Sequence, residues 1–167
     1  WQPVLVHRPA GGFERLDKLA LEAGVRVWAM PEMSGGRDAG WVLRVARLFR
    51  AEDASVFHAH RTEANQGAYG VLAAIAARLP AVVVTQHHLN VTYASGRRAQ
   101  EMLVSAGVDR FITVSHEVAR NLRPRCLFPG RIQVIHNGID LRPFGRPPNS
   151  ELRRVLNKGT GRPIVLC

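Results

Sequence analysis

Several kinds of residue are scarce in this chain of 167 residues, and each shortage narrows the class of protein. Cysteine occurs only at Cys126 and Cys167, too few for a disulfide framework or a four-cysteine zinc site. No apolar run approaches the roughly 18 residues that a membrane helix needs. Aromatic residues make up 7%, which argues against the stacking platforms of a nucleic-acid binder. Two free thiols are typical of a cytoplasmic protein.

Acidic residues are also scarce, with 13 Asp and Glu against 23 Lys and Arg, for a net charge of +10. Arginine supplies nearly all of the positive charge, because Lys18 and Lys158 are the only lysines. Such an excess favours polyanions such as nucleic acid, anionic lipid or phosphorylated ligands. The arginines are scattered through the expected helices, however, and a GC-rich genome also enriches arginine. A non-catalytic basic binding module therefore stays open as one interpretation, with nucleic acid disfavoured as its partner.

The two ends of the chain differ from ordinary protein termini, which are usually polar and frayed. The sequence begins with Trp1 and ends with four apolar residues, 164–167. We therefore expect a piece of a longer protein.

Short apolar runs rich in β-branched residues alternate with stretches of helical periodicity. Residues 13–23, for example, place apolar side chains at i, i+3 and i+4 and are followed by Gly24 as a stop. This alternation predicts an α/β fold with a Rossmann-like open, mostly parallel doubly wound sheet. The expected strands are residues 3–7, 25–30, 56–60, 81–87, 110–115, 132–136 and 163–167. The expected helices are 13–23, 38–50, 63–79, 95–106, 117–122 and 151–156.

Histidines gather where these strands are expected to end. His58 and His60 close one strand, and His87 and His88 close another. Ligands bind outside the carboxyl ends of open parallel sheets, where imidazoles can act as acids, bases or hydrogen-bond donors. A packed, structural histidine is the competing interpretation at each position, above all at His58. The remaining histidines, also at strand ends, are His7, His116 and His136.

A His-x-His pair at a strand end also opens the metal sites of some hydrolases. A metal-dependent hydrolase using His58 and His60 would need further ligands from other strand ends. Carboxylates are sparse there, and no His-Glu-x-x-His or Cys-x-x-Cys motif occurs. We expect no metal site, and keep the hydrolase as an alternative.

Four motifs follow one another in the chain at characteristic spacings. They are "SVFHAH" (55–60), "AVVVTQHH" (81–88), "DRFITVS" (109–115) and "IQVIHNGID" (132–140). Their order resembles that in family-four glycosyltransferases of the GT-B fold, although Ser55 stands where the family usually has Asp. The resemblance implies that residues 1–145 form the N-terminal acceptor-binding Rossmann-like domain, lacking its first strand. Residues 146–167 would then form the linker, with the Pro-rich segment before Ser150, and the first strand of a truncated C-terminal donor-binding domain.

The resemblance also implies site residues. His87 matches a family histidine in the catalytic cleft, next to the acceptor and the transferred sugar. Ser115 is either an acceptor contact or a helix N-cap, for which serine is favoured. Asn137 and Gly138 are expected to form a tight turn that Asp140 ties down. The residues expected to bind the acceptor are His60, Arg61, Ser115, Asn137 and Gly138.

The activity implied by the resemblance is that of a retaining glycosyltransferase acting in cell-envelope glycan or glycolipid synthesis, such as that of lipopolysaccharide. It would move a sugar from a nucleotide-sugar, its co-substrate, to an acceptor hydroxyl, with no cofactor and no bound metal. The parent protein would be the enzyme, because the residues that grip the donor belong to the missing C-terminal domain, and the fragment alone would be inactive. A non-hydrolysing epimerase shares the architecture but would require carboxylates that these strand ends lack.

Partners and location follow from the same interpretation. We expect a nucleotide-sugar and a glycan or glycolipid acceptor as ligands, and no nucleic acid. Arg44, Arg47 and Arg50 lie on one face of an expected helix and suit an anionic membrane surface, unless they form a merely solvated face. We therefore expect a cytoplasmic protein that is peripheral on the inner face of the membrane.

Overall fold

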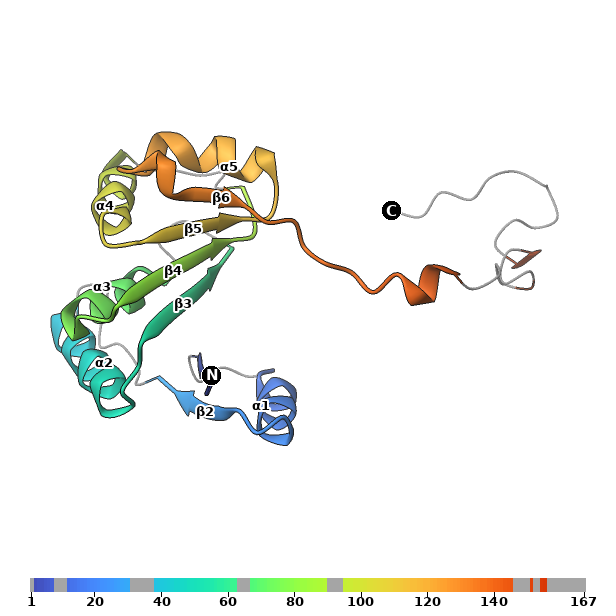
Figure 1. Ribbon diagram of the computed structural model, residues 1–167, viewed down its shortest axis with the longest axis horizontal. Coiled ribbons are helices and arrows are strands. Elements are labelled where there is room, and N and C mark those ends of the chain that lie inside the picture. Colours follow the sequence, from blue (N-terminus) through green and yellow to red (C-terminus); the bar gives the residue numbers. More distant parts are fainter. Residues whose placement is uncertain are drawn as a thin grey trace. The chain divides into compact units, whose positions relative to one another are not determined.

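The computed structural model describes residues 2–7, 12–30, 38–62, 67–89, 95–145, 151 and 154–155. The chain divides into two compact units, of which the first is Trp1–His136 and the second is Asn137–Cys167. The first unit alternates strands and helices, as the sequence predicts (Figure 1). Its elements are β1 (Val4–His7), α1 (Glu14–Glu22), β2 (Arg26–Ala29), α2 (Ala39–Ala51), β3 (Val56–Arg61), α3 (Ala68–Ala77), β4 (Ala81–Gln86), α4 (Ser95–Ser105), β5 (Arg110–Thr113), α5 (His116–Leu122), the 3-10 turns η1 (Arg123–Arg125) and η2 (Pro129–Arg131), and β6 (Ile132–Val134).

All described strand pairs are parallel, which confirms the predicted fold class. They form a two-stranded sheet, β1-β2, and a four-stranded sheet in the order β3-β4-β5-β6. In the larger sheet each strand pairs with the next one in the chain, so every crossover advances in the same direction. Because such crossovers are right-handed, the helices α3, α4 and α5 lie on one face of this sheet. Figure 1 shows α2 and α3 side by side along β3 and β4.

The hydrophobic core lies on that helical face. Phe111 on β5 and Leu122 on α5 are each 1% exposed and belong to one cluster with buried residues of α2, α3, β3, β4 and α4. A Cβ on Gly70 of α3 would lie 2.6 Å from Cζ of Phe57, so the glycine lets the helix approach β3 closely. The opposite face of β3 is therefore left without a helix from this layer.

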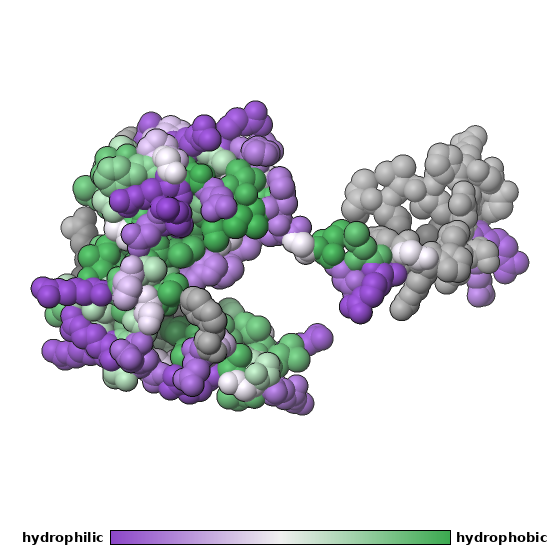
Figure 2. Space-filling model, viewed as in Figure 1, coloured by the Kyte–Doolittle hydropathy of each residue, from purple (hydrophilic) through white to green (hydrophobic). Residues whose placement is uncertain are grey.

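The N-terminal strands make their own contacts with this layer. Arg26 on β2 forms an ion pair with Glu52 at the end of α2, and Met30 packs against the core. Gly24 ends α1 with φ of 74°, as the sequence predicts. Leu16, Leu19 and Leu21 of α1 remain exposed, and hydrophobic atoms are visible over this helix in Figure 2.

Polar side chains begin two of the helices. Asp38 accepts a hydrogen bond from the Trp41 amide at 2.7 Å and caps α2. Ser115 Oγ accepts one from the Val118 amide at 3.2 Å and caps α5, which confirms its predicted role as an N-cap. None of the described helices is both long and apolar enough to span a bilayer.

The predicted turn at Asn137-Gly138 is wrong. No turn is assigned there, Gly138 lacks a positive φ, and the exposed chain makes no close approach around it. Asp140 instead accepts hydrogen bonds from the Arg142 amide and guanidinium, at the start of the 3-10 turn η3 (Arg142–Gly145). An Asn-Gly pair permits a turn but does not impose one, and no strand follows it among the described residues.

Other expectations fall outside the described residues. The expected strand at 163–167 lies wholly outside the described residues. So do most of the helix expected at 151–156 and residues 63–66 of the helix expected at 63–79. The assignment of 146–167 to a second domain therefore stays a prediction, as does the boundary after residue 145.

The Ser115 cap can be tested by stability. Replacing Ser115 with alanine removes the acceptor for the Val118 amide and should lower the free energy of unfolding by about 1 kcal/mol. Ser115→Asp retains an acceptor and should lose much less. Urea denaturation of both variants measures the difference, and equal losses would contradict a capping role.

Candidate active site

Three imidazoles meet at the carboxyl ends of β3 and β4. His60 Nδ1 and His87 Nε2 share a hydrogen bond of 2.9 Å. The ring of His60 also stacks on that of His58, with centroids 4.4 Å apart. His58 Nε2 is in turn hydrogen-bonded to Thr85 Oγ1 at 2.8 Å. The result is a continuous chain of contacts from the side chain of Thr85 to His87, hereafter called the imidazole chain.

The pairing of β3 with β4 explains why these side chains meet. Residues alternate between the faces of a strand, so His58 and His60 share the face opposite the helical core. The register places His58 beside Val83 and His60 beside Thr85, on the same face of β4. The His87 amide then donates to the Arg61 carbonyl at 2.9 Å, which extends the ladder by one residue and brings the His87 ring next to His60.

The imidazole chain favours uncharged rings. Burial lowers the pKa of His58, and the nearby His87 lowers it further. Burial also lowers the pKa of His60, with smaller contributions from His58 and His87. Both rings are therefore neutral near pH 7, where each has one nitrogen that donates and one that accepts.

Gln86 fixes the backbone on both sides of the site. Its side chain is fully buried, and its Nε2 donates to the carbonyls of His88 at 2.7 Å and Thr62 at 3.4 Å. One amide thereby connects the segments that leave β3 and β4. Gln86 was not among the residues predicted from the sequence, although a Gln within the otherwise apolar "AVVVTQ" is an available signal.

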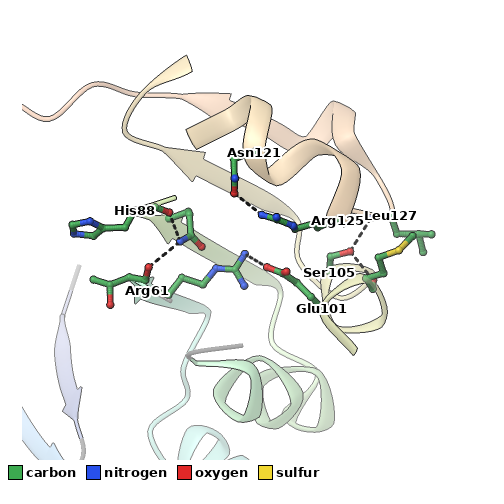
Figure 3. Close-up of polar contacts among 10 residues, drawn as sticks. Arg61, His88, Glu101, Ser105, Asn121, Arg125 and Leu127 are labelled. Carbon is green, nitrogen blue, oxygen red and sulfur yellow. Dashed lines mark hydrogen bonds and ion pairs between the residues drawn. The ribbon is translucent and has the colours of Figure 1, made fainter. Parts of the chain in front are cut away.

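Arg61 lies on the other face of the sheet from His60. It is 4% exposed, and its Nη2 lies 3.2 Å from Oε1 of the equally buried Glu101 on α4 (Figure 3). The guanidinium also lies over the Phe111 ring, 5.4 Å from its centroid. The family resemblance implied that Arg61 lines the acceptor side beside His60, and the expected strand ended at residue 60. Since β3 continues through Arg61, alternation turns this side chain into the core, and the acceptor role gains no support from its position.

The other predicted residues take no part in the contacts described above. Ser115 caps α5, and its acceptor role stays a prediction, as do those of Asn137 and Gly138, which belong to the second unit. His88 is exposed, with its ring away from the buried ion pair in Figure 3. The rings of His116 and His136 form a second contact, with centroids 5.6 Å apart.

The hydrolase alternative requires a third metal ligand near His58 and His60. Within the part of the chain that the structure describes, no three His, Cys, Asp or Glu residues are placed to hold a metal ion. The observed pairing of the rings with each other and with Thr85 gives this alternative no support.

The fold and the site together define a class of protein. It is an open parallel α/β domain with hydrogen-bonding imidazoles at the carboxyl edge, where such sheets bind ligands. The profile of glycosyltransferase family 4 matches residues 2–142, and the chain belongs to this family. No match was found among curated proteins.

Solved structures share the fold. A glycosyltransferase from Rickettsia africae aligns with a TM-score of 0.63 and 14% identity, covering 94% of this chain and 41% of its own. Anabaena HepE, solved in complex with UDP and glucose, aligns with a TM-score of 0.57 and 15% identity, covering 93% of this chain and 42% of its own. This chain thus spans less than half the length of either neighbour, and the likeness confirms the Rossmann-like GT-B fold.

The buried Arg61–Glu101 pair generates a stability prediction. Arg61→Met removes the cation from a buried carboxylate and should lower the free energy of unfolding by about 3–5 kcal/mol. The double variant Arg61→Met/Glu101→Leu removes both charges and should recover most of that loss. Urea denaturation measures both, and a double variant no more stable than Arg61→Met would contradict a compensating pair.

Proposed function

We propose that this chain is the acceptor-binding part of a retaining glycosyltransferase. The parent enzyme moves a sugar from a nucleotide-sugar to an acceptor hydroxyl, in the synthesis of a cell-envelope glycan or glycolipid such as lipopolysaccharide. The observation that carries the proposal is the His60–His87 hydrogen bond at the carboxyl edge of the sheet, in a chain that belongs to glycosyltransferase family 4.

In this reaction the bond between the sugar and the diphosphate breaks, and a bond from the sugar to the acceptor oxygen forms. The acceptor hydroxyl loses its proton to an oxygen of the nucleoside diphosphate, which departs as the leaving group. His87 lies at the catalytic cleft and hydrogen-bonds a reacting hydroxyl, while His60 lines the acceptor side. The nucleotide-sugar is a co-substrate, gripped by a second domain, and the proposal includes no cofactor or bound metal. The complex of HepE with UDP and glucose supports a nucleotide-sugar as donor.

The helical layer supports a membrane-associated acceptor. Arg47 and Arg50 are exposed on α2, and Arg50 donates to the Ala76 carbonyl of α3. The helix α3 exposes Leu72 and Ile75, and neither helix contains an acidic residue, although Asp38 at the start of α2 pairs with Arg44. Basic side chains beside apolar ones suit an anionic bilayer. The protein is accordingly proposed to be cytoplasmic and peripheral on the inner membrane face.

The role of His87 can be tested in the protein encoded by the complete reading frame. His87→Ala removes the imidazole at the cleft and should lower kcat by roughly 100-fold or more, because positioned acid–base groups contribute about that much. The assay measures release of nucleoside diphosphate from UDP- and GDP-sugars in the presence of lipid and glycan acceptors. His88→Ala is the matched control, since His88 is exposed and its ring takes no part in the imidazole chain. Equal turnover by both variants would contradict the assignment.

The membrane surface has its own test. Each basic side chain near an anionic bilayer contributes about 1 kcal/mol, so replacing Arg44, Arg47 and Arg50 with glutamine should weaken binding by about 3 kcal/mol, or roughly 150-fold. Co-sedimentation with vesicles containing phosphatidylglycerol measures the change. Replacing Arg110, Arg120 and Arg123 with glutamine removes the same charge from β5, α5 and η1. Unchanged binding by the first variant, or equal loss in both, would remove the proposed surface.

A further inference from the structure

The hydrogen bond between His60 and His87 occupies one ring nitrogen of His87, its Nε2. We propose that His60 is a positioning residue that fixes the orientation and tautomer of His87, so that Nδ1 is the nitrogen left for the substrate. This inference rests on the proposed function only in taking His87 as the cleft residue. The structural part, one imidazole setting the state of another, is testable in this chain without turnover.

A histidine side chain on a protein surface can rotate its ring and exchange its proton between the two nitrogens. A fixed partner at one nitrogen selects a single orientation and determines which nitrogen carries the proton, as orienting partners of metal-bound histidines do. The His87 ring is only half-buried and follows the end of β4, so the strand alone does not fix it. His60 supplies the fixed partner at 2.9 Å, and the two rings stack with centroids 5.2 Å apart.

The side chain of His60 is exposed, but contacts with its neighbours hold its ring, so it can serve as a fixed partner. It lies inside β3 and stacks on His58, whose Nε2 is hydrogen-bonded to Thr85. Thr85 is 5% exposed and belongs to a central strand, so the imidazole chain is anchored in the sheet. Movement of His60 would break contacts on both sides of its ring.

The charge state of the neighbours also favours this arrangement. The titratable groups that face His60 within the described residues are His58 on β3 and His87 after β4, whereas Arg61 faces the opposite side and pairs with Glu101. Burial keeps the pKa of His60 low, so its ring stays neutral and its Nδ1 can accept a hydrogen bond. With the Nε2 of His87 bonded to His60, its Nδ1 is left to hydrogen-bond a substrate oxygen.

Nuclear magnetic resonance of the chain labelled with ¹⁵N at histidine tests the inference. One-bond and two-bond ¹⁵N–¹H correlations report which nitrogen of His87 carries the proton. In His60→Phe, the aromatic ring is kept and the partner is lost, so the His87 nitrogen shifts should move toward those of an exchanging, unpaired imidazole. In His60→Asn, the side-chain oxygen occupies the place of Nδ1, and the shifts should stay near those of the wild type. His60→Gln, whose amide reaches the place of Nε2 instead, serves if the phenylalanine variant does not fold.

His88→Asn is the control, because it alters an adjacent exposed histidine outside the imidazole chain. Wild-type shifts for His87 in His60→Phe, or in His60→Gln where Phe is not tolerated, would overturn the inference. The inference would also be overturned if His60→Asn changed the His87 shifts as much as His60→Phe does. A purely structural role of His60 would not distinguish the two substitutions. In the complete enzyme, His60→Phe should lower kcat roughly 10-fold to 100-fold, with rescue by His60→Asn. If His60→Phe changes the His87 shifts while His87→Ala leaves turnover unchanged, the proposed function is contradicted and the positioning role of His60 is supported.

Discussion

The pairing of β3 with β4 is the constraint on which the site depends. In a strand, a shift of one residue exchanges the two faces, so the register decides which side chains meet the core and which meet the ligand side. The observed register turns Arg61 into the core and leaves His58 and His60 on the other face. The two functions of this segment, anchoring the helical layer and presenting imidazoles, thus alternate along six residues.

The order and type of the elements could be predicted from periodicity, because apolar spacing reports which side of an element is buried. The gathering of histidines at one edge followed from parallel topology alone. The role of Arg61 could not be predicted, because it depends on whether β3 ends at residue 60 or 61, and strand ends carry little sequence signal. The prediction of a turn at Asn137-Gly138 was wrong for a related reason. Two residues permit a turn, but whether the chain forms one depends on the contacts around it.

The buried polar side chains were a larger gap in what could be predicted from the sequence. Gln86 and Glu101 are buried without being apolar, and a composition pattern assigns such residues to the surface. Each is retained because a specific partner compensates its loss of water: two backbone carbonyls for Gln86 and a guanidinium for Glu101. These partners come from distant parts of the chain, so only the folded structure brings them together. Their effect is a rigid carboxyl edge from which the histidines project.

The net charge of +10 is a poor guide to the chemistry of this edge. Three imidazoles whose successive centroids lie 4.4 Å and 5.2 Å apart resist simultaneous protonation, since each charge disfavours the next. With His58 and His60 held neutral, the edge offers directed hydrogen bonds rather than a concentrated positive field. That property suits recognition of an uncharged hydroxyl better than capture of a phosphate. The exposed arginines of α2 belong to the helical layer, which packs against the opposite face of the sheet. The proposed hydroxyl acceptor and the proposed anionic membrane would therefore contact different residues, which the fold places on opposite faces of the sheet.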